Sequence, residues 1–573
     1  MAGRPSGPRR TAALSVGVDE LRSLVVRTRE LVLFTALIGA ATGLGVAVLD
    51  RVTVEILLDS ARRAPVALRV LLPGAGLVVT TLALRHLGRG ASPSTADEYV
   101  KAIPHPEVPF DLRSVPARLV GALATLGTGG AGGLEGPAIF IGSATGAGVF
   151  ERVRHRLRGV DRRAALVAGA AAGVAAIFKA PATGAVFALE VPFQEDLAPR
   201  AILPALVGAA SGYTSFVVLN GTEPLFPVEG HASLALIDLG VAAVLGLACG
   251  VGARVFTALM TAAKVAVTRI PAVPRVLAAS VVLGALVAGS EAGFDGRSLS
   301  MGPGYETVRF ALDPGRGLWI IAALATVRVL ATASTVGGGG VAGMFVPLVV
   351  QGALTGRLLA GFFDADDQSL WVVVGVAAFL GAGYRVPLAA VMFTAEATGR
   401  PGFVVPGLIA ATIAQLVMGT ASMSAYQRRR RDGHMEQRAD LPIATVLSTD
   451  PAVAHGSDTV AQFFTEHVAL ARRQAVPLVD AEGHHRGMVV LDDILAIEPE
   501  SWPGVTLADV ARYDVPVGRP DWTLGRALRA MIDGDVDHLP VVDAAGRLRG
   551  MVTSAAIIDR TALMDRLDGG GDR

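Results

Sequence analysis

The chain has 573 residues, of which 52% are hydrophobic and 18% are charged, and its mean hydropathy is +0.51. A soluble protein usually carries about 25% charged residues, so this composition argues against an ordinary soluble enzyme. The net charge of +1 gives no indication of a nucleic-acid partner, and we expect none. The one cysteine, Cys249, excludes a disulfide within the chain, and no metal site is expected.

Apolar segments separated by short polar breaks recur between residues 31 and 425. A helix needs about 20 apolar residues to cross the hydrocarbon core, and some of these segments are shorter or are broken by Gly or Pro. Non-helical backbone at membrane depth is tolerated where protein or a water-filled cavity covers it, so the short segments indicate a transport pathway. The candidates are Leu31–Asp50, Val66–Leu84, Arg163–Glu190, Ala201–Leu219, Leu239–Leu259, Val276–Gly289, Leu318–Ala333, Val341–Leu359, Leu370–Leu380 and Phe403–Thr420.

Basic residues flank the apolar region on both sides. The tail 1–30 carries several arginines, and the linker 427–440 begins with the run Arg428 to Arg431. Basic residues close to membrane ends stay on the cytoplasmic side. We therefore expect an integral membrane protein with both termini in the cytoplasm. Since the chain has no eukaryotic-style extensions, a prokaryotic plasma membrane is expected.

A soluble α/β region with an internal repeat follows the linker. Proline, a hydrophobic pair, Asp, a Gly turn and Arg-Gly-Met-Val recur at an offset of 63 residues, from Pro477 to Pro540 and from Gly487 to Gly550. Each copy is predicted to be a strand, a turn and a strand that leads into a helix. The copies are placed at 441–500 and 501–565.

The membrane region, 31–426, is also repeated. Gly133–Gly146 and Gly343–Gly356 share the pattern G-x3-P-x4-G-x3-G, and Phe178–Glu190 matches Tyr384–Glu396 at nearly the same offset. These matches divide the region into halves at about 31–225 and 235–425. The predicted fold is an all-α polytopic membrane domain with an internal repeat, followed by an α/β pair. Transporters with such halves bind their substrates where half-helix ends converge.

The first repeat motif places an acid at the start of a helix. Gly133 and Gly136 allow close approach of a ligand, and Pro137 suits the first turn of a helix, so Glu135 is expected at a helix N-terminus. A carboxylate and an inorganic anion are both stabilised there and compete for one place. Glu135 is therefore predicted to gate the site; a simple capping carboxylate is the alternative.

The second motif, Gly343–Gly356, has glycine and proline at the same positions as the first but carries no acid. The backbone N–H groups of Met344 and Phe345 are therefore predicted to be free to hold an anion. A tight glycine contact between helices is the alternative. The phenol of Tyr426, at the end of the membrane region, can donate to an anion, although a tyrosine at the membrane interface is also a common structural feature.

Two more acids, Glu190 and Glu396, lie on apolar segments at equivalent places in the two halves. A base precedes each by eleven residues, at Lys179 and Arg385. Because the acids form a repeat-related pair, a structural ion pair or a helix-end contact is favoured. A proton relay is the alternative.

These features resemble the CLC family of chloride channels and proton-coupled chloride transporters, over about residues 31–426. The resemblance implies a homodimer with one inverted-repeat pore per subunit. It also implies that Glu135 is the gating glutamate and that the Met344 and Phe345 amides and the Tyr426 hydroxyl hold the central anion. The soluble repeats resemble a pair of CBS domains.

The chain departs from the CLC pattern at three places. Leu134 stands where a base usually precedes the gating glutamate. The family's motif G-S-G-I-P has no clean match; Ser92, in the stretch 88–100, is the nearest candidate for its serine. Proton-coupled members often carry a second glutamate directly after the residue that matches Glu190, where this chain has Val191.

The CBS copies each keep half of a pattern that is typical of adenine-nucleotide binding. The first copy has Asp493 but Val490 at the hydroxyl position, and the second has Thr553 but Ala556 at the acid position. Unpaired polar groups would weaken nucleotide binding. A structural or regulatory pair is therefore the first interpretation and an adenine-nucleotide site at Asp493 and Thr553 the second.

The function predicted from the sequence is transmembrane transport of small inorganic anions, with chloride first among them. A passive channel and a proton-coupled antiporter both remain open. A CBS-regulated cation transporter would need intramembrane Asp clusters for a hard cation, which the apolar segments lack. No nucleophile triad, phosphate loop or zinc spacing is present, so an enzyme is not expected.

Overall fold

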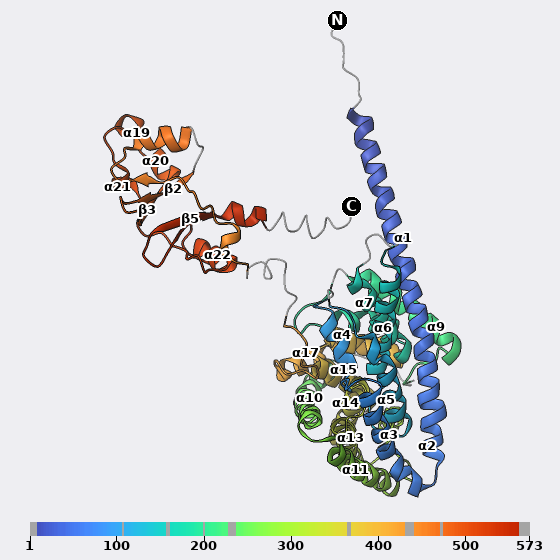
Figure 1. The fold of residues 1–573 in the computed structure, drawn as a ribbon. Coiled ribbons are helices and arrows are strands. Elements are labelled where there is room, and N and C mark those ends of the chain that lie inside the picture. The colour runs from blue at the N-terminus through green and yellow to red at the C-terminus, as the bar shows by residue number, and fades with distance from the viewer. Residues whose placement is uncertain are drawn as a thin grey trace. The chain divides into compact units, whose positions relative to one another are not determined.

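The computed structural model describes residues 9–105, 108–155, 161–198, 201–226, 236–313, 315–363, 368–429, 441–469 and 474–560. The chain divides into two compact units, Met1–Arg431 and Asp432–Arg573. Figure 1 shows that the first unit is built from helices and that the strands lie in the second.

The helices of the first unit differ widely in length, as expected for a membrane domain with interrupted spans. A π-helical stretch, Arg51–Leu58, joins the first two, and short 3₁₀ helices at Leu112–Ser114 and Pro401–Phe403 precede two others. The helices are α1 (Arg9–Asp50), α2 (Asp59–Arg63), α3 (Val66–His86), α4 (Ala96–Ala102), α5 (Val115–Gly127), α6 (Glu135–Val153), α7 (Arg162–Phe178), α8 (Pro181–Glu190), α9 (Ile202–Asn220), α10 (Leu236–Arg269), α11 (Ala272–Gly293), α12 (Tyr305–Leu312), α13 (Leu318–Gly337), α14 (Phe345–Phe362), α15 (Gln368–Tyr384), α16 (Pro387–Thr398) and α17 (Val404–Met418).

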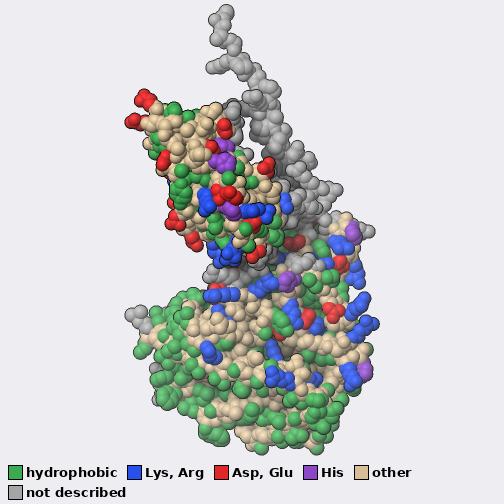
Figure 2. All heavy atoms as spheres, turned by 60° about the vertical axis from the view of Figure 1, so that its left-hand side comes forward, with side chains coloured by type: hydrophobic (Ala, Val, Ile, Leu, Met, Phe, Trp, Pro, Cys, Tyr) green, Lys and Arg blue, Asp and Glu red, His purple; other side chains and the backbone are tan. Residues whose placement is uncertain are grey.

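Among the described residues, eight helices are long and apolar enough to cross a membrane. The most apolar stretch of α11 is only 28% buried within the protein, whereas that of α14 is 72% buried. Exposed apolar side chains on the outer helices are costly in water but not against lipid. Figure 2 shows a broad hydrophobic surface on this unit. The first unit is thus an integral membrane domain, with α14 in its interior.

The predicted segment Arg163–Glu190 is two helices rather than one. α7 ends at Phe178, Lys179 takes a left-handed conformation with φ of 52°, and Pro181 begins α8. A proline lacks the N–H that would continue α7 but suits the first position of a new helix. Arg385, with φ of 57°, separates α15 from α16 in the same way.

The two halves repeat the same backbone contacts. A Cβ added to Gly142 of α6 would lie 2.0 Å from the carbonyl oxygen of Gly169 of α7. A Cβ added to Gly352 of α14 would lie 2.4 Å from the carbonyl oxygen of Gly375 of α15. Each pair of helices is therefore in backbone contact at matching glycines, which is why larger residues are absent there.

The repeat-related acids Glu190 and Glu396 cap each other's helices. Glu190, at the end of α8, accepts hydrogen bonds from the Leu388 and Ala389 N–H groups at the start of α16. Glu396, near the end of α16, accepts from N–H groups at the start of α8. The two helices therefore run antiparallel, so that the internal repeat is an inverted one.

The second unit contains two small sheets with separate cores. In the first, β1 (Ala454–His455) pairs in parallel with β2 (Ala475–Val479), which pairs antiparallel with β3 (His485–Val490). In the second, β4 (His538–Val542) pairs antiparallel with β5 (Leu548–Thr553). The helices of this unit are α19 (Val460–Phe463), α20 (Leu491–Leu495), α21 (Leu507–Val510) and α22 (Leu524–Asp533), with a π-helical stretch at Phe464–Ala469 and 3₁₀ helices at Ile443–Thr445 and Pro499–Ser501.

Each of the two cores contains a residue from the other predicted copy of the repeat. Leu507 packs in the first core, with Val460 and Val476. Ile443, at the start of the unit, packs in the second core with Leu524 and Leu539. The hairpins repeat as the sequence predicts, and the all-α membrane domain followed by an α/β pair is confirmed.

Candidate functional site

Two helix N-termini from the two halves meet in the interior of the membrane unit. α6 begins at Glu135 and α14 begins at Phe345. The loops before them are joined by two backbone hydrogen bonds: the Gly133 N–H donates to the Gly343 carbonyl over 2.9 Å, and the Gly343 N–H donates to the Gly133 carbonyl over 2.7 Å. The predicted position of Glu135 at a helix start is therefore correct, and the two repeat motifs face each other.

The Glu135 side chain lies across the N-terminus of the opposite helix. It is 1% exposed. Its Oε1 accepts a hydrogen bond from the Phe345 N–H at 2.5 Å, and the carboxylate also interacts with the Val346 N–H. Oε2 has no hydrogen-bond partner among the described residues. Unpaired N–H groups at a helix start attract anions, so Glu135 occupies the place where an anion would bind.

Glycine is required on both sides of this carboxylate. A Cβ on Gly343 would lie 2.1 Å from Oε1 of Glu135 and 2.6 Å from the Gly136 backbone nitrogen. A Cβ on Gly136 would lie 3.0 Å from the Gly343 Cα. Real Cβ atoms essentially never show contacts as short as those at Gly343, and the contact at Gly136 is tighter than most. Gly136 and Gly343 thus allow the two N-termini to approach each other.

A buried hydroxyl that the sequence did not single out faces the same place. Thr95 directly precedes α4 and is 2% exposed. Its Oγ1 has no hydrogen-bond partner among the described residues, and it would lie 2.7 Å from a Cβ on Gly136. An unpaired buried hydroxyl carries a desolvation cost unless something binds it, so Thr95 is directed at the site.

Ser92, the predicted serine contact, has other partners. Its hydroxyl accepts a hydrogen bond from the Ser94 N–H at 3.2 Å, and its carbonyl accepts one from Nε of Arg118 at 3.0 Å. These hydrogen bonds show that Ser92 stabilises the loop before α4. A sequence signal for Thr95 existed, since a threonine directly before Ala96 with acids in the first turn is typical of a helix start.

Two tyrosines differ sharply in their surroundings. Tyr426, the predicted anion contact, is 48% exposed, and Nζ of Lys101 lies 4.1 Å from the centroid of its ring. Tyr384, at the end of α15, is 5% exposed, and its phenol interacts with the Met344 N–H and electrostatically with Glu135. The buried phenol therefore adjoins the helix N-termini, whereas Tyr426 lies at the surface.

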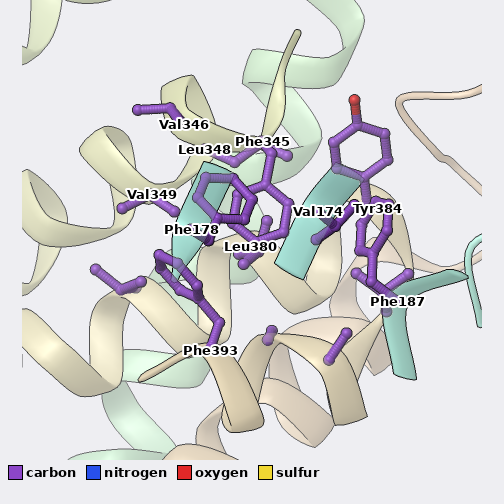
Figure 3. Packing of buried hydrophobic residues seen from close by; sticks show 14 of the residues in the cluster. Val174, Phe178, Phe187, Phe345, Val346, Leu348, Val349, Leu380, Tyr384 and Phe393 are labelled. Carbon is purple, nitrogen blue, oxygen red and sulfur yellow. The ribbon is translucent and has the colours of Figure 1, made fainter. Parts of the chain in front are cut away.

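A cluster of aromatic rings supports the start of α14. The Phe345 ring lies 4.3 Å from that of Phe178 and 5.0 Å from that of Phe393, measured between centroids. Figure 3 shows these rings packed together, with the hydroxyl of Tyr384 pointing away from the cluster. Tyr384 is the repeat counterpart of Phe178, so the second half carries a hydroxyl where the first carries only a ring.

The predicted nucleotide residues of the second unit are engaged within the unit. Asp493 accepts two hydrogen bonds from Arg512, at 2.7 and 2.8 Å. The Thr553 hydroxyl accepts one from the Ala556 N–H at 3.0 Å, which caps the segment that follows β5. Both side chains thus have hydrogen-bond partners within the unit.

One turn of the second unit gathers possible metal ligands. The ligand atoms of Asp480, Glu482 and His484 lie within 4.8 Å of one another. However, Asp480 already binds the His484 N–H and the guanidinium of Arg486. These contacts hold the β2–β3 turn and explain the conformation without an ion.

Comparisons with known proteins agree with this geometry. A family model described as voltage gated chloride channel matches residues 75–419, and a CBS domain model matches residues 507–562. The H(+)/Cl(-) exchange transporter ClcA of Vibrio cholerae is 25% identical over 350 residues, which cover 58% of this chain and 72% of that protein. A putative chloride channel protein ClcB-like of Ralstonia nicotianae is 28% identical over 395 residues, covering 66% and 89%.

Solved structures share the fold at lower sequence identity. A slow cyanobacterial Cl-/H+ antiporter superposes with a TM-score of 0.61 at 19% identity, covering 68% of this chain and 94% of that one. A eukaryotic CLC transporter superposes with a TM-score of 0.59 at 20% identity, covering 91% and 97%. The second match extends into the soluble unit, so the order of a helical unit and an α/β pair is shared as well.

Proposed function

The chain belongs to the voltage-gated chloride channel family, and on that premise we propose that it exchanges chloride for protons across the membrane. Transport of small anions follows from the family, whose model covers more than half of the chain. The choice of chloride and of coupling to protons is supported by relatives that are named as H(+)/Cl(-) exchange transporters.

The position of Glu135 is the observation that carries the proposal. Its carboxylate accepts the Phe345 N–H at 2.5 Å, with the Val346 N–H beside it. An anion bound to the same N–H groups would meet a like charge, so the ionised carboxylate and chloride exclude each other. Protonation removes that charge and frees the helix N-terminus. Uptake of a proton by Glu135 is thereby linked to entry of an anion.

We place the central anion among the backbone and side-chain donors around this point. The N–H groups of Met344 and Phe345 supply the α14 end of the site, and Gly133 and Gly136 allow the close approach. The Thr95 hydroxyl lies close to Gly136, and the Tyr384 phenol interacts with the Met344 N–H. We therefore propose these two hydroxyls as donors instead of Ser92 and Tyr426. Hydroxyl and amide donors around a small anion substitute for its hydration shell.

A passive channel is the second candidate, and Val191 is the residue that favours it. Val191 follows Glu190 and is 2% exposed, so a hydrocarbon stands where many exchangers carry an acid. Without another proton-binding group on that side of Glu135, the anion would move uncoupled. The two candidates share one anion path and differ only in whether protons travel with the anion.

Reconstitution in liposomes decides between exchange and passive flow. With a chloride gradient imposed and the membrane potential set by valinomycin and potassium, an exchanger pumps protons uphill, and a channel moves none. Glu135→Ala should abolish proton movement and leave chloride flux. Glu55→Gln is the matched control, because this acid is half-exposed and pairs with Arg51. Coupled proton movement in the Glu135→Ala variant would refute the gate.

The resemblance also supports a homodimer with both termini in the cytoplasm. Cross-linking in membranes and protease access to the soluble unit in sealed vesicles test these two points separately. A monomer, or a soluble unit cleaved from the outside of right-side-out vesicles, would contradict them.

For the soluble pair we propose a structural or regulatory role rather than adenine-nucleotide binding. The Arg512 side chain satisfies Asp493, and a nucleotide ribose would have to displace it. Equilibrium dialysis of the intact protein with ATP tests this proposal, and saturable binding that is lost in Asp493→Asn would overturn it.

A further inference from the structure

The two loops that lead into α6 and α14 are each held by a threonine from the other half of the repeat. The Thr335 hydroxyl, near the end of α13, accepts a hydrogen bond from the Ala131 N–H at 2.9 Å. The Thr125 hydroxyl, near the end of α5, accepts one from the Val341 N–H at 3.1 Å. The two threonines occupy equivalent positions in the two halves, and so do the two N–H donors. The same connection between the halves is therefore made twice.

Each threonine also holds the loop of its own half. The Thr125 carbonyl accepts a hydrogen bond from the Gly130 N–H at 2.8 Å, and the Thr335 carbonyl accepts one from the Gly340 N–H at 2.9 Å. A Cβ added to Gly340 would lie 2.8 Å from Cγ2 of Thr125 and 2.9 Å from Cγ2 of Thr335, so both threonines pack against this loop. Each threonine thus binds one loop through its carbonyl and the other through its hydroxyl.

The surroundings of the two hydroxyls fix them as acceptors. Both threonines are 0% exposed. A hydroxyl has one proton to donate, and Thr335 donates it to the Ala331 carbonyl at 2.9 Å. Because the Thr80 hydroxyl donates to the Gly121 carbonyl, the Thr125 hydroxyl donates to Thr80 over 2.8 Å. Without either hydroxyl, a buried backbone N–H of the opposite loop would lose its acceptor, which is costly.

These hydrogen bonds lie close to the groups that bind and compete at the site. Ala131 precedes Glu135 by four residues, and Val341 precedes Phe345 by four. The Glu135 carboxylate and the Phe345 N–H form one hydrogen bond but belong to different loops. A shift of one loop relative to the other would therefore change this contact directly. A misplacement of about 1 Å can change the activity of a site by about a hundredfold.

We propose that Thr125 and Thr335 are positioning residues that set the distance between Glu135 and the N–H groups of α14. Thr335 acts on the loop that carries Glu135, and Thr125 acts on the loop that carries Phe345. The carboxylate and an anion can then replace each other without rearrangement of the loops, because the donors are already in place. The inference rests on the proposed exchange of chloride for protons at this site.

The test is chloride binding to the purified full-length protein, measured by calorimetry at acidic and at alkaline pH. If ionised Glu135 competes with chloride, the wild type binds chloride more weakly at alkaline pH. Thr335→Val keeps the shape of the side chain and removes the acceptor of the Ala131 N–H, so the carboxylate is misplaced and competes less. The ratio of the alkaline to the acidic Kd should therefore fall by about threefold or more.

Thr125→Val should act on the anion donors instead. It removes the acceptor of the Val341 N–H and displaces the start of α14, so the Kd for chloride should rise by about tenfold at both pH values. In a Glu135→Ala background this rise should persist, whereas Thr335→Val should have no further effect. General loosening of the fold would act alike in both backgrounds, so the contrast separates positioning from stability.

Matched variants control for the loss of a buried hydroxyl. Thr335→Ser and Thr125→Ser keep the acceptor and should bind chloride as the wild type does. Thr53 is 1% exposed, and its hydroxyl donates to the carbonyl of Leu49, four residues before it, over 2.6 Å. Thr53→Val should therefore leave binding unchanged. If a valine variant does not fold, cysteine replaces it, because its sulfur is a weak acceptor.

Each outcome supports or overturns the proposal. Wild-type binding in both Thr335→Val and Thr125→Val overturns it. A loss that serine does not restore, or one that Thr53→Val shares, also overturns it, because either result indicates a general effect on folding. So does an effect of Thr335→Val that persists in the Glu135→Ala background. If the wild-type Kd is the same at both pH values and Glu135→Ala does not change it, the proposed gate itself has failed.

Discussion

Gly133 and Gly343 exchange two backbone hydrogen bonds, and this short ladder sets the positions of both helix N-termini. Two residues beyond Gly133, Glu135 reaches the N–H of Phe345, two residues beyond Gly343. The repeat is therefore symmetric in its backbone and asymmetric in its chemistry. One half supplies a helix N-terminus that has no acid of its own. The other half supplies the carboxylate that accepts a hydrogen bond from that N-terminus.

Gly343→Ala should close the site. The added Cβ would lie 2.1 Å from Oε1 of Glu135, so the carboxylate or α14 must move. We expect chloride flux in liposomes to fall by about tenfold or more, because a misplacement of about 1 Å at a site has effects of that size or larger. Gly240→Ala on α10 is the control, since nothing lies within 4 Å of its added Cβ. Wild-type flux in Gly343→Ala would contradict the geometry.

The sequence predicted the frame of the site but not its hydroxyls. Glu135 and the Gly–Pro motifs were found because their roles depend on local backbone and on the repeat. The roles of Thr95 and Tyr384 depend on where the start of α4 and the end of α15 lie in space, which spacing along the chain does not reveal. Ser92 is the serine next to a proline, but it stands three residues before Thr95, the residue that directly precedes α4.

For the fold as well, the sequence predicts local elements but not their tertiary relationships. The ten apolar segments all overlap helices, because hydrophobicity along the chain reports burial in lipid or protein. The pattern of Arg163–Glu190 predicts one segment because its break is a single left-handed residue, Lys179, shortly before a proline, and no run of polar residues marks it. The antiparallel pairing of α8 with α16 is a tertiary relationship that hydrophobic periodicity does not encode.

Thr95→Val should weaken anion binding without unfolding the protein. The substitution keeps the shape of the side chain and removes a hydroxyl that has no partner among the described residues. A hydrogen bond to a charged group contributes about 1.5–3 kcal/mol, so the Kd for chloride should rise by about tenfold or more. Calorimetry on the purified protein measures it. Thr95→Ser should retain affinity, and Ser92→Ala should match the wild type. Weakened binding in Ser92→Ala with intact binding in Thr95→Val would reverse the assignment.

The β2–β3 turn should lose stability in acid. Partial desolvation raises the pKa of Asp480, but the His484 N–H, the Arg486 guanidinium and the His484 ring outweigh it and hold the pKa at about 2. A carboxylate whose pKa is lower in the folded state than its usual value of 3.8 stabilises the fold above that value. The contribution is lost as the pH falls from about 4 through 2.

Hydrogen exchange of the segment 475–490 in the intact protein measures this loss, after correction for the intrinsic exchange rate at each pH. The wild-type protein should be protected at pH values above 4 and less so near 2. Asp480→Asn should show weaker protection throughout and no acid transition at this turn. Asp521→Asn, at an exposed acid of the same unit, should behave as the wild type. An acid transition that persists unchanged in Asp480→Asn would assign it to another group.

Glu396→Gln and Glu190→Gln should lower stability and leave proton coupling intact. Glu396 accepts the Ala182 N–H at 2.9 Å and the Thr183 N–H at 2.7 Å, and Glu190 accepts the Ala389 N–H at 2.9 Å. A carboxylate at a helix N-terminus contributes about 0.3–2 kcal/mol. An amide keeps one acceptor oxygen and loses the charge, so the unfolding temperature in detergent should drop in both variants.

The same two variants distinguish a helix-capping role of Glu190 from a role as a proton relay. A relay requires a group that binds and releases a proton, and glutamine does neither. If Glu190 carries protons, Glu190→Gln abolishes proton movement in liposomes while Glu396→Gln retains it. Because Glu190 and Glu396 each bind two backbone N–H groups at the start of the opposite helix, we expect the two variants to behave alike. Both should show lower stability, chloride flux and an unchanged ratio of protons to chloride.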